Sequence, residues 1–303
     1  PVIGIVQSNV AQSNKNRPTF ETDQAMWDQL VQLTMQVVER QPRPELVVWP
    51  ETSVPAALNV EGVATAWEIV STWRPVSPAL LERLLPEERE SYERMAEAYG
   101  VDFRDLPQYL TRWYSFKGSR PDALAQIARQ LDVELVVGSP TLVSADPSER
   151  YNSVYSISPT TGMRDQRFDK IHRVPFGEYL PWVERVPALK QWFITYLTPH
   201  DKDYTLSPGK GPVIFSFESS QGPVTFATPI CYEDAFPRVC RRLVFDTATG
   251  ERQAQLMINL TNDGWYPETA QGPQHMQLAT LRCIETRTPM VRSVNTGVSG
   301  YIN

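Results

Sequence analysis

The stretch Val224-Thr-Phe-Ala-Thr-Pro-Ile-Cys-Tyr-Glu-Asp-Ala-Phe-Pro237 decides how the rest of the sequence is interpreted. Its first half is an apolar run that predicts a buried strand ending at Cys231. Residues 238–243 follow with a pattern compatible with a helix. A thiol at the turn from a strand into a helix occupies the position in which α/β hydrolases present a nucleophile. A buried, unreactive cysteine is the alternative, because free cysteine is among the most buried residue types.

The composition indicates a chain with a sizeable core and argues against a nucleic-acid partner. Of 303 residues, 41% are hydrophobic and 10% aromatic. The net charge of −6 lacks the basic excess of nucleic-acid-binding proteins. The three cysteines and three histidines lack the spacing of a zinc site.

No apolar run approaches the roughly 20 residues of a membrane-spanning helix, and no signal peptide is recognisable. The sequence begins at Pro1 without a methionine and ends at Asn303 within a predicted strand. We therefore expect the chain to be a segment of a longer polypeptide.

The order of the predicted elements indicates a layered α/β fold. Apolar, β-branched runs predict strands at 2–7, 45–50, 134–138, 151–158 and 164–169, and helical spacing predicts helices at 21–40, 121–130 and 273–286. Residues 8–17 are polar and are predicted to form a loop. Helices that alternate with apolar strands are typical of a layered sandwich. Because no repeat or linker-like composition divides the chain, we expect a single domain over residues 1–303.

Residues 60–122 do not follow this alternation and are interpreted as an inserted helical region. Proline after serine at Ser77-Pro78 predicts a helix start, and a charged helix is expected at 87–99. The aromatic residues Trp113, Tyr114 and Phe116 suit a local core beneath this insertion. A substrate-facing or membrane-facing surface is the alternative.

Three chemically complementary residues each lie at the end of a predicted strand: Glu51, Lys170 and Cys231. Open α/β sheets gather their sites at such strand ends. A carboxylate within reach can take the proton of a thiol as a general base. An ammonium group nearby can stabilise the oxyanion that forms when the thiolate attacks a carbonyl. Each residue alone also has an ordinary structural explanation.

The residues around this trio resemble the nitrilase (carbon–nitrogen hydrolase) superfamily. The matching motifs are, in order, Trp49-Pro-Glu-Thr52, Lys170-Ile-His-Arg-Val-Pro-Phe-Gly-Glu-Tyr-Leu-Pro181, Ile230-Cys-Tyr-Glu233 and Asn262-Asp-Gly-Trp-Tyr266. Three features are most similar to one branch of the superfamily, apolipoprotein N-acyltransferase. They are Val-Pro-Phe-Gly-Glu-Tyr, the Phe-Pro after Cys-Tyr-Glu, and the final stretch of residues 272–282 and 292–300. The resemblance covers nearly the whole chain outside 60–122. It implies the superfamily's αββα sandwich.

The resemblance also implies roles for individual residues. Glu51 is expected to be the base, Lys170 the oxyanion stabiliser and Cys231 the nucleophile that carries a thioester. Glu178 matches a second glutamate that supports the lysine and the first glutamate. No metal and no cofactor are implied. The residues expected to shape the substrate pocket are Tyr232, Glu233, Asn262, Asp263 and Trp265.

The remaining histidines and cysteines receive structural interpretations. Packing is expected for His275, Cys240 and Cys283, a structural role for His172, and solvent exposure for His200. The backbone N–H of Tyr232 is a candidate oxyanion donor, because it follows a nucleophile at a strand-to-helix turn.

The branch resemblance implies an acyltransferase. Its acyl donor is expected to be a phospholipid and its acceptor the N-terminal amine of a diacylglyceryl-cysteine lipoprotein, on the periplasmic face of a bacterial inner membrane. Segment 181–198 contains the apolar residues Trp182, Trp192, Phe193, Tyr196 and Leu197, which suit a membrane surface or ordinary packing. A soluble cytoplasmic amidase with the same trio is the first alternative. An inactive scaffold that binds partners is the second.

Overall fold

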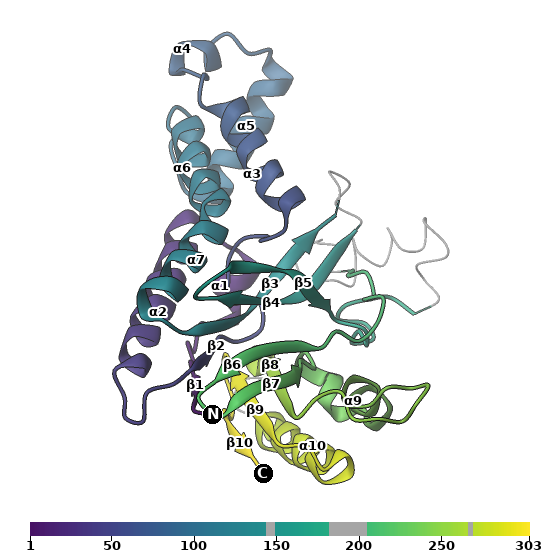
Figure 1. The fold of residues 1–303 in the computed structure, drawn as a ribbon. Coiled ribbons are helices and arrows are strands. Elements are labelled where there is room, and N and C mark those ends of the chain that lie inside the picture. Colours follow the sequence, from purple (N-terminus) through teal and green to yellow (C-terminus); the bar gives the residue numbers. More distant parts are fainter. Residues whose placement is uncertain (144–148, 182–204, 266–268) are drawn as a thin grey trace.

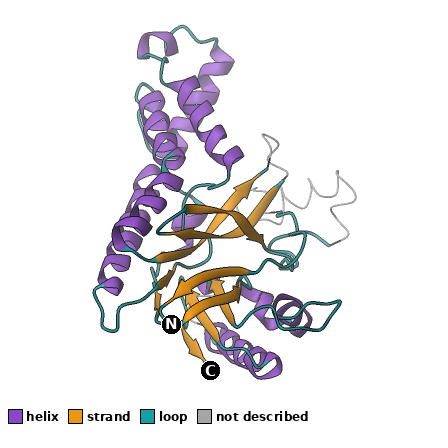
Figure 2. Cartoon of the chain, viewed as in Figure 1, coloured by secondary structure: helices purple, strands orange, loops and turns teal. Residues whose placement is uncertain are grey.

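Two five-stranded sheets form the centre of this computed structural model (Figures 1 and 2). The structure describes residues 1–143, 149–181, 205–265 and 269–303. The first sheet comprises, in order, β1 (Ile3–Ile5), β2 (Leu46–Val48), β3 (Glu134–Leu142), β4 (Arg150–Ser158) and β5 (Gly162–Asp169). The second comprises β10 (Gly300–Ile302), β9 (Met290–Val294), β8 (Leu256–Thr261), β7 (Gly222–Ala227) and β6 (Phe215–Ser219).

Strands β1, β2 and β3 are parallel to one another, as are β7, β8 and β9. Of these, β2, β8 and β9 are buried along their whole length, which explains their continuous apolar runs. In β2, Leu46 and Val48 enter the core between the sheets, together with Phe226 and Ile258 of the second sheet. The intervening Val47 points to the opposite face. This alternation follows from the two-residue period of a strand. It places one core between the sheets and a further core outside each of them.

Helices cover the outer face of each sheet. The first sheet is covered by α2 (Phe20–Val38) and α7 (Arg120–Leu131), and the second by α9 (Pro237–Val244) and α10 (Gln271–Thr286). Helix α2 begins with a capping box between Thr19 and Thr22. Trp49, at the end of β2, donates a hydrogen bond to Thr34 of α2 at 2.8 Å and so locks this helix to the strand that delivers Glu51. The predicted αββα sandwich is confirmed.

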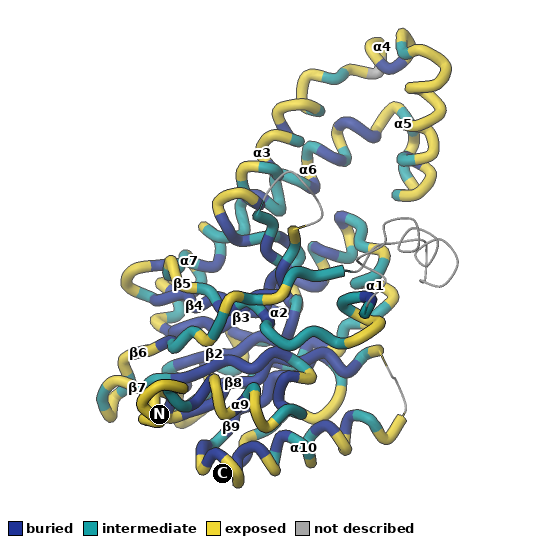
Figure 3. The backbone as a smooth tube through the Cα atoms, turned by 90° about the vertical axis from the view of Figure 1, so that its right-hand side faces the viewer, coloured by how far each residue is buried: buried dark blue, intermediate teal, exposed yellow. Residues whose placement is uncertain are grey.

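The insertion forms a helical arm that projects from the sandwich (Figure 1). It comprises α3 (Val60–Trp73), α4 (Pro78–Leu81), α5 (Pro86–Tyr99) and α6 (Leu106–Gly118). Trp113 and Leu110 are buried in a core of their own that Phe20 of α2 completes. The interpretation of the aromatic cluster as a local core is therefore confirmed. The outer surface of the arm is largely exposed (Figure 3).

Some expectations differ from the structure or lie outside it. The prediction of a loop over residues 8–17 is wrong for Gln12–Asn16, which form a short helix, α1, in which the side chain of Gln12 donates to that of Asn16. Segment 182–198, His200 and Tyr266 lie outside the described residues. Among the residues that are described, no helix is long and apolar enough to cross a membrane. The single-domain assignment stays a prediction.

Candidate active site

Cys231 lies at a sharp turn between strand and helix. After β7, Ile230 still pairs with Leu260 of β8, and the 3-10 turn η3 (Cys231–Ala235) then begins and leads into α9. The φ angle of Cys231 is +50°, a region that a residue with a Cβ adopts at a cost of order 1–3 kcal/mol. The amide of Asn259 supports the turn by donating to the carbonyls of Pro229 and Cys231, each at 3.1 Å. The backbone therefore holds the thiol in a fixed position.

Lys170 is the centre of a buried group of charges. It follows β5, is only 1% exposed, and its ammonium donates to Glu178 at 2.6 Å. The Glu51 carboxylate lies 3.6 Å from the same ammonium. An ordinary role as a surface lysine is therefore excluded for Lys170 by its burial. The structure brings both glutamates to one cation, as the sequence predicted.

The electrostatic environment poises these groups for proton transfer. Burial raises the pKa of Glu51, and the charge of Lys170 opposes this rise. Burial, followed by the charge of Glu51, also raises the pKa of the Cys231 thiol. Burial lowers the pKa of Lys170, but the surrounding Cys231, Glu51 and Glu178 outweigh it and raise that pKa above its ordinary value. In the resting site the Cys231 thiol is therefore neutral and Lys170 is charged. The raised pKa of Glu51 makes its carboxylate a better acceptor for the thiol proton.

Glu178 is held by the tight turn that precedes it. Its second carboxylate oxygen accepts from the backbone N–H of Val174 at 2.8 Å. Phe176 in the same turn has a φ of +62° and is 61% exposed. The turn therefore fixes the carboxylate toward Lys170 and leaves an aromatic ring at the surface beside it.

Glu233 differs from its expected place in the substrate pocket. Its side chain is completely buried and accepts hydrogen bonds from the backbone N–H groups of Ile171, His172 and Ile230, at 2.7, 2.8 and 2.8 Å. Burial raises the pKa of Glu233 to about 7, although these N–H bonds oppose the shift. Two of the donors directly follow Lys170 and the third directly precedes Cys231. Glu233 therefore connects the segment that carries Lys170 to the segment that carries Cys231.

Asp263 and His275 belong to a buried ionic cluster that the sequence did not predict. The two ring nitrogens of His275 lie 2.8 Å from Asp263 and 2.7 Å from Asp234. Arg292, which is fully buried, donates to the other oxygen of Asp234 at 3.0 Å. His275 is buried as expected, but it carries polar contacts in place of simple packing. Across the described ranges, no group of His, Cys, Asp and Glu side chains is arranged to hold a metal ion.

The other predicted pocket residues divide into buried and exposed positions. Asn262 is buried and bonds to Gln12 and Asn295 at 2.7 and 3.0 Å, which places it under the site. Tyr232 and Trp265, the latter 53% exposed at the end of η4 (Asp263–Trp265), remain at the surface. Of the five predicted pocket residues, only these two have exposed side chains.

Two supporting residues had no signal in the sequence. Asn152 of β4 donates to Glu51 at 2.7 Å. Lys15 of α1 donates to the Glu51 carbonyl at 3.0 Å, and burial lowers the pKa of this lysine to about 8. Neither residue belongs to any of the four sequence motifs. Their positions depend on strand pairing and on the approach of α1.

Replacing Asn152 by alanine is expected to move the acid limb of the rate profile to higher pH. Its hydrogen bond favours the ionised form of Glu51, so its loss raises the pKa of that base further. Activity requires ionised Glu51 and is lost as pH falls through this pKa. The measurement is kcat/KM against pH for acylation of Cys231 by a small ester. The control is Ser156→Ala, in the same strand as Asn152, which removes a hydrogen bond to Glu134 of β3. It should leave the acid limb at the same pH.

Curated proteins similar in sequence to this chain include apolipoprotein N-acyltransferases. Apolipoprotein N-acyltransferase 2 of Treponema denticola is 35% identical over 187 residues, which are 60% of this chain and 32% of that protein. Apolipoprotein N-acyltransferase of Allorhizobium ampelinum is 27% identical over 307 residues, 99% of this chain and 44% of that protein. The chain thus spans less than half the length of these curated relatives.

Solved structures show the same fold at low sequence identity. A mutant of the amidase from Nesterenkonia sp. AN1 has a TM-score of 0.51 at 14% identity, covering 99% of this chain and 81% of that one. Saccharomyces cerevisiae Nit3, a member of branch 10 of the nitrilase superfamily, has a TM-score of 0.50 at 16% identity, covering 96% and 74%. The family pattern described as carbon-nitrogen hydrolase matches residues 3–302. This chain therefore belongs to the carbon-nitrogen hydrolase family.

Proposed function

We propose that this chain is the catalytic part of an acyltransferase. It moves an acyl chain from a phospholipid to the N-terminal amine of a diacylglyceryl-cysteine lipoprotein, with Glu51, Lys170 and Cys231 as its catalytic residues. The observation that carries the proposal is the buried Glu51–Lys170–Glu178 group beside Cys231, in a chain similar to apolipoprotein N-acyltransferases.

The first half-reaction forms a thioester on Cys231. Glu51 takes the thiol proton as the sulfur attacks the ester carbonyl of the phospholipid. The Lys170 ammonium and the backbone N–H of Tyr232 stabilise the oxyanion. When the carbonyl reforms, the C–O bond breaks and Glu51 returns the proton to the departing lysophospholipid oxygen. The acyl group remains on sulfur.

The second half-reaction regenerates the enzyme. The free α-amine of the lipoprotein attacks the thioester, and Glu51 accepts a proton from the nitrogen. The C–S bond breaks to give an amide, and the proton returns to Cys231. Because Glu51 has a raised pKa, it suits both receiving and returning this proton.

Exposed aromatic side chains near the site suit lipid substrates and a membrane surface. Phe176 lies in the turn before Glu178, Tyr232 follows Cys231, and Trp265 ends the Asp263 turn. Large exposed apolar side chains that gather in one region mark interaction surfaces. We place the enzyme at the bacterial inner membrane, with the site on the periplasmic face.

The amidase alternative keeps the same first steps and makes water the acceptor in the cytoplasm. The geometry of the trio suits either acceptor, so the similarity to the acyltransferases decides the preference. An inactive scaffold fits the structure less well, because burying Lys170 with two carboxylates is costly and packing does not require it.

The first experiment is intact-mass analysis after incubation with phospholipid, using the protein as its gene encodes it. We expect an acyl mass increment on Cys231 that disappears when an N-terminal cysteine lipopeptide is added. Cys231→Ala should show none, and Cys283→Ala should retain it because that thiol is buried outside the site. Failure to acquire the adduct, combined with hydrolysis of small amides, favours the amidase. Neither reaction favours the scaffold.

A further inference from the structure

Helix α9, which follows the nucleophile turn, presents an arginine-rich surface. It buries Cys240, Leu243 and Val244 and exposes Arg238, Arg241 and Arg242. Within the described parts of the chain, no carboxylate forms an ion pair with any of the three guanidinium groups. Arg241 instead lies over the ring of Phe245 at 5.4 Å. Arg238 and Arg242 are therefore available cations in a chain of net charge −6.

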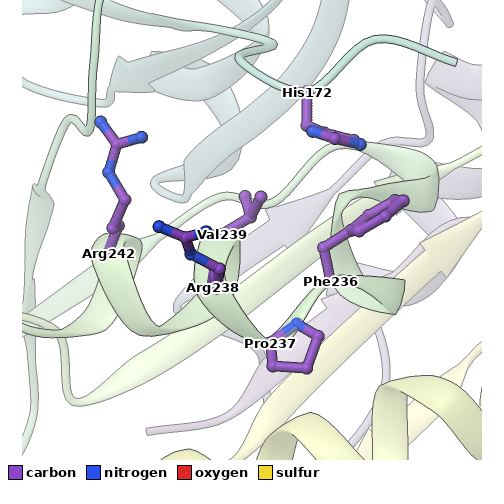
Figure 4. Close-up of a pocket in the computed structure, with 6 residues that line it drawn as sticks. All are labelled: His172, Phe236, Pro237, Arg238, Val239 and Arg242. Atoms are coloured by element: carbon purple, nitrogen blue, oxygen red, sulfur yellow. The ribbon is translucent and has the colours of Figure 1, made fainter.

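A cavity of about 370 Å³ lies beside these two arginines (Figure 4). Its size falls in the range of small-molecule sites. In Figure 4, α9 supplies one wall through Arg238, Val239 and Arg242, and His172 lies across from it. Phe236 and Pro237 complete the apolar part of the lining. A second hollow of about 330 Å³ is also lined by Arg238 and Arg242, so both arginines line two adjoining hollows.

Aromatic contacts connect the lining of the cavity to the neighbours of the catalytic residues. His172 follows Lys170 by two residues, and its ring lies 3.9 Å from that of Phe236. Phe236 in turn contacts Tyr232, the neighbour of Cys231, at 5.2 Å between ring centroids. Burial, and then the charge of Lys170, lowers the pKa of His172. The imidazole is neutral near pH 7, so the arginines set the charge of the cavity.

The spacing of Arg238 and Arg242 suits a single anionic group. Residues four apart lie on the same face of a helix, about 5–6 Å apart at their Cβ atoms. A guanidinium presents paired N–H groups that match phosphate oxygens, and it is less strongly hydrated than an ammonium. The apolar lining from Phe236, Pro237 and Val239 suits hydrocarbon. The combination fits an amphiphile that carries a phosphate.

We propose that Arg238 and Arg242 bind the phosphate group of the phospholipid that donates its acyl chain to Cys231. This assignment rests on the proposed function. Arg238 and Arg242 would then determine which acyl donor is accepted, although neither belongs to the catalytic Glu–Lys–Cys group. Among the described residues the two guanidinium groups have no carboxylate partner, so their charge is complementary to a phosphodiester. This complementarity favours a phospholipid over a second copy of the acidic chain.

The test compares two acyl donors with the same acyl chain, a short-chain phosphatidylglycerol and the phosphate-free diacylglycerol. In Arg238→Ala/Arg242→Ala, the ratio of their kcat/KM values for loading Cys231 should fall roughly tenfold or more. For Arg238→Lys/Arg242→Lys, the ratio should lie between that of the alanine variant and that of wild type. Lysine keeps the positive charge but lacks the paired N–H groups of a guanidinium. Arg94→Ala/Arg104→Ala removes the same charge from the arm and should leave the ratio unchanged.

Direct binding separates this inference from the proposed function. In the Cys231→Ala background, the short-chain phospholipid should bind more weakly by the same factor when both α9 arginines are replaced, and weaken as salt is added. If the alanine variant loads Cys231 normally and the ratio of kcat/KM values for the two donors is unchanged, the phosphate site is rejected and the proposed function is not affected. Absence of any adduct, with arginine-dependent phospholipid binding intact, rejects the acyltransferase and its donor. Equal, arginine-dependent binding of inorganic phosphate identifies a free-phosphate site and overturns the lipid assignment, as does an arginine-dependent dimer without lipid binding.

Discussion

Replacing Lys170 by methionine is expected to abolish adduct formation on Cys231 and to lower the free energy of unfolding by about 3–5 kcal/mol. The ammonium serves two carboxylates, 2.6 Å from Glu178 and 3.6 Å from Glu51. Without it, the buried Glu51 and the partly buried Glu178 face each other with no cation, and the pKa of Glu51 rises further. The oxyanion also loses a charged donor, a loss worth roughly two to three orders of magnitude in rate.

The two effects of Lys170→Met are separable by measurement. Urea unfolding gives the stability, and adduct formation is followed by mass at a temperature where the variant remains folded. Lys117→Met is the matched control, because Lys117 is also largely buried, pairs with Asp23 at 3.6 Å and lies in the arm. It should cost stability while acylation per folded molecule is kept. Normal loading by folded Lys170→Met enzyme would show that Lys170 is structural only.

The layered fold was predictable because its signals are local. The apolar runs at β2 and β3 and the helical spacing at α2 are each contained within one element, and both faces of these strands are buried. The helix α1 was missed because three of its five residues, Ser13, Asn14 and Asn16, have weak intrinsic helix preferences. Its stability comes from contacts with the Glu51 segment, which are not visible in its own sequence.

Residues of the site could be predicted from the sequence only when they belong to one of the four motifs, which Asn152 and Lys15 do not. Glu51, Lys170 and Glu178 meet as expected, but Glu233 and Asp263 turn inward, although both stand in the same motifs. Sequence order alone does not tell which motif residues face substrate, because a 3-10 turn directs successive side chains to different sides. The partners of the inward residues, such as Arg292, come from distant strands. Only the packed sheet brings them together.

The buried ionic cluster makes a second large and pH-dependent prediction. Burial lowers the pKa of His275, but its bonds to Asp234 and Asp263 outweigh burial and raise that pKa to about 9. A raised pKa means that the stabilisation is fully present below about pH 6.5 and is lost as pH rises to about 9. The shift corresponds to roughly 3 kcal/mol. The wild-type protein should therefore lose about this much unfolding free energy to His275 across that window.

His275→Gln removes this titration and is expected to flatten the profile. The variant should be less stable than wild type by about 3 kcal/mol near pH 6, and the two stability curves should converge above about pH 9. Lys15 titrates with the opposite sign, because its pKa is lowered to about 8, and Glu233, with a pKa of about 7, contributes at lower pH. Both are unchanged in the variant, so the difference between the curves isolates His275.

Urea unfolding at several pH values provides the measurement, with His172→Gln as the matched control that should keep the wild-type slope. Parallel curves for wild type and His275→Gln would show that the imidazole is neutral in the folded protein. A convergence of the curves instead establishes that an imidazolium holds Asp234 and Asp263 together. Since Asp234 lies three residues after Cys231 and Asp263 begins the Trp265 turn, acylation of Cys231 should decline over the same pH range as stability.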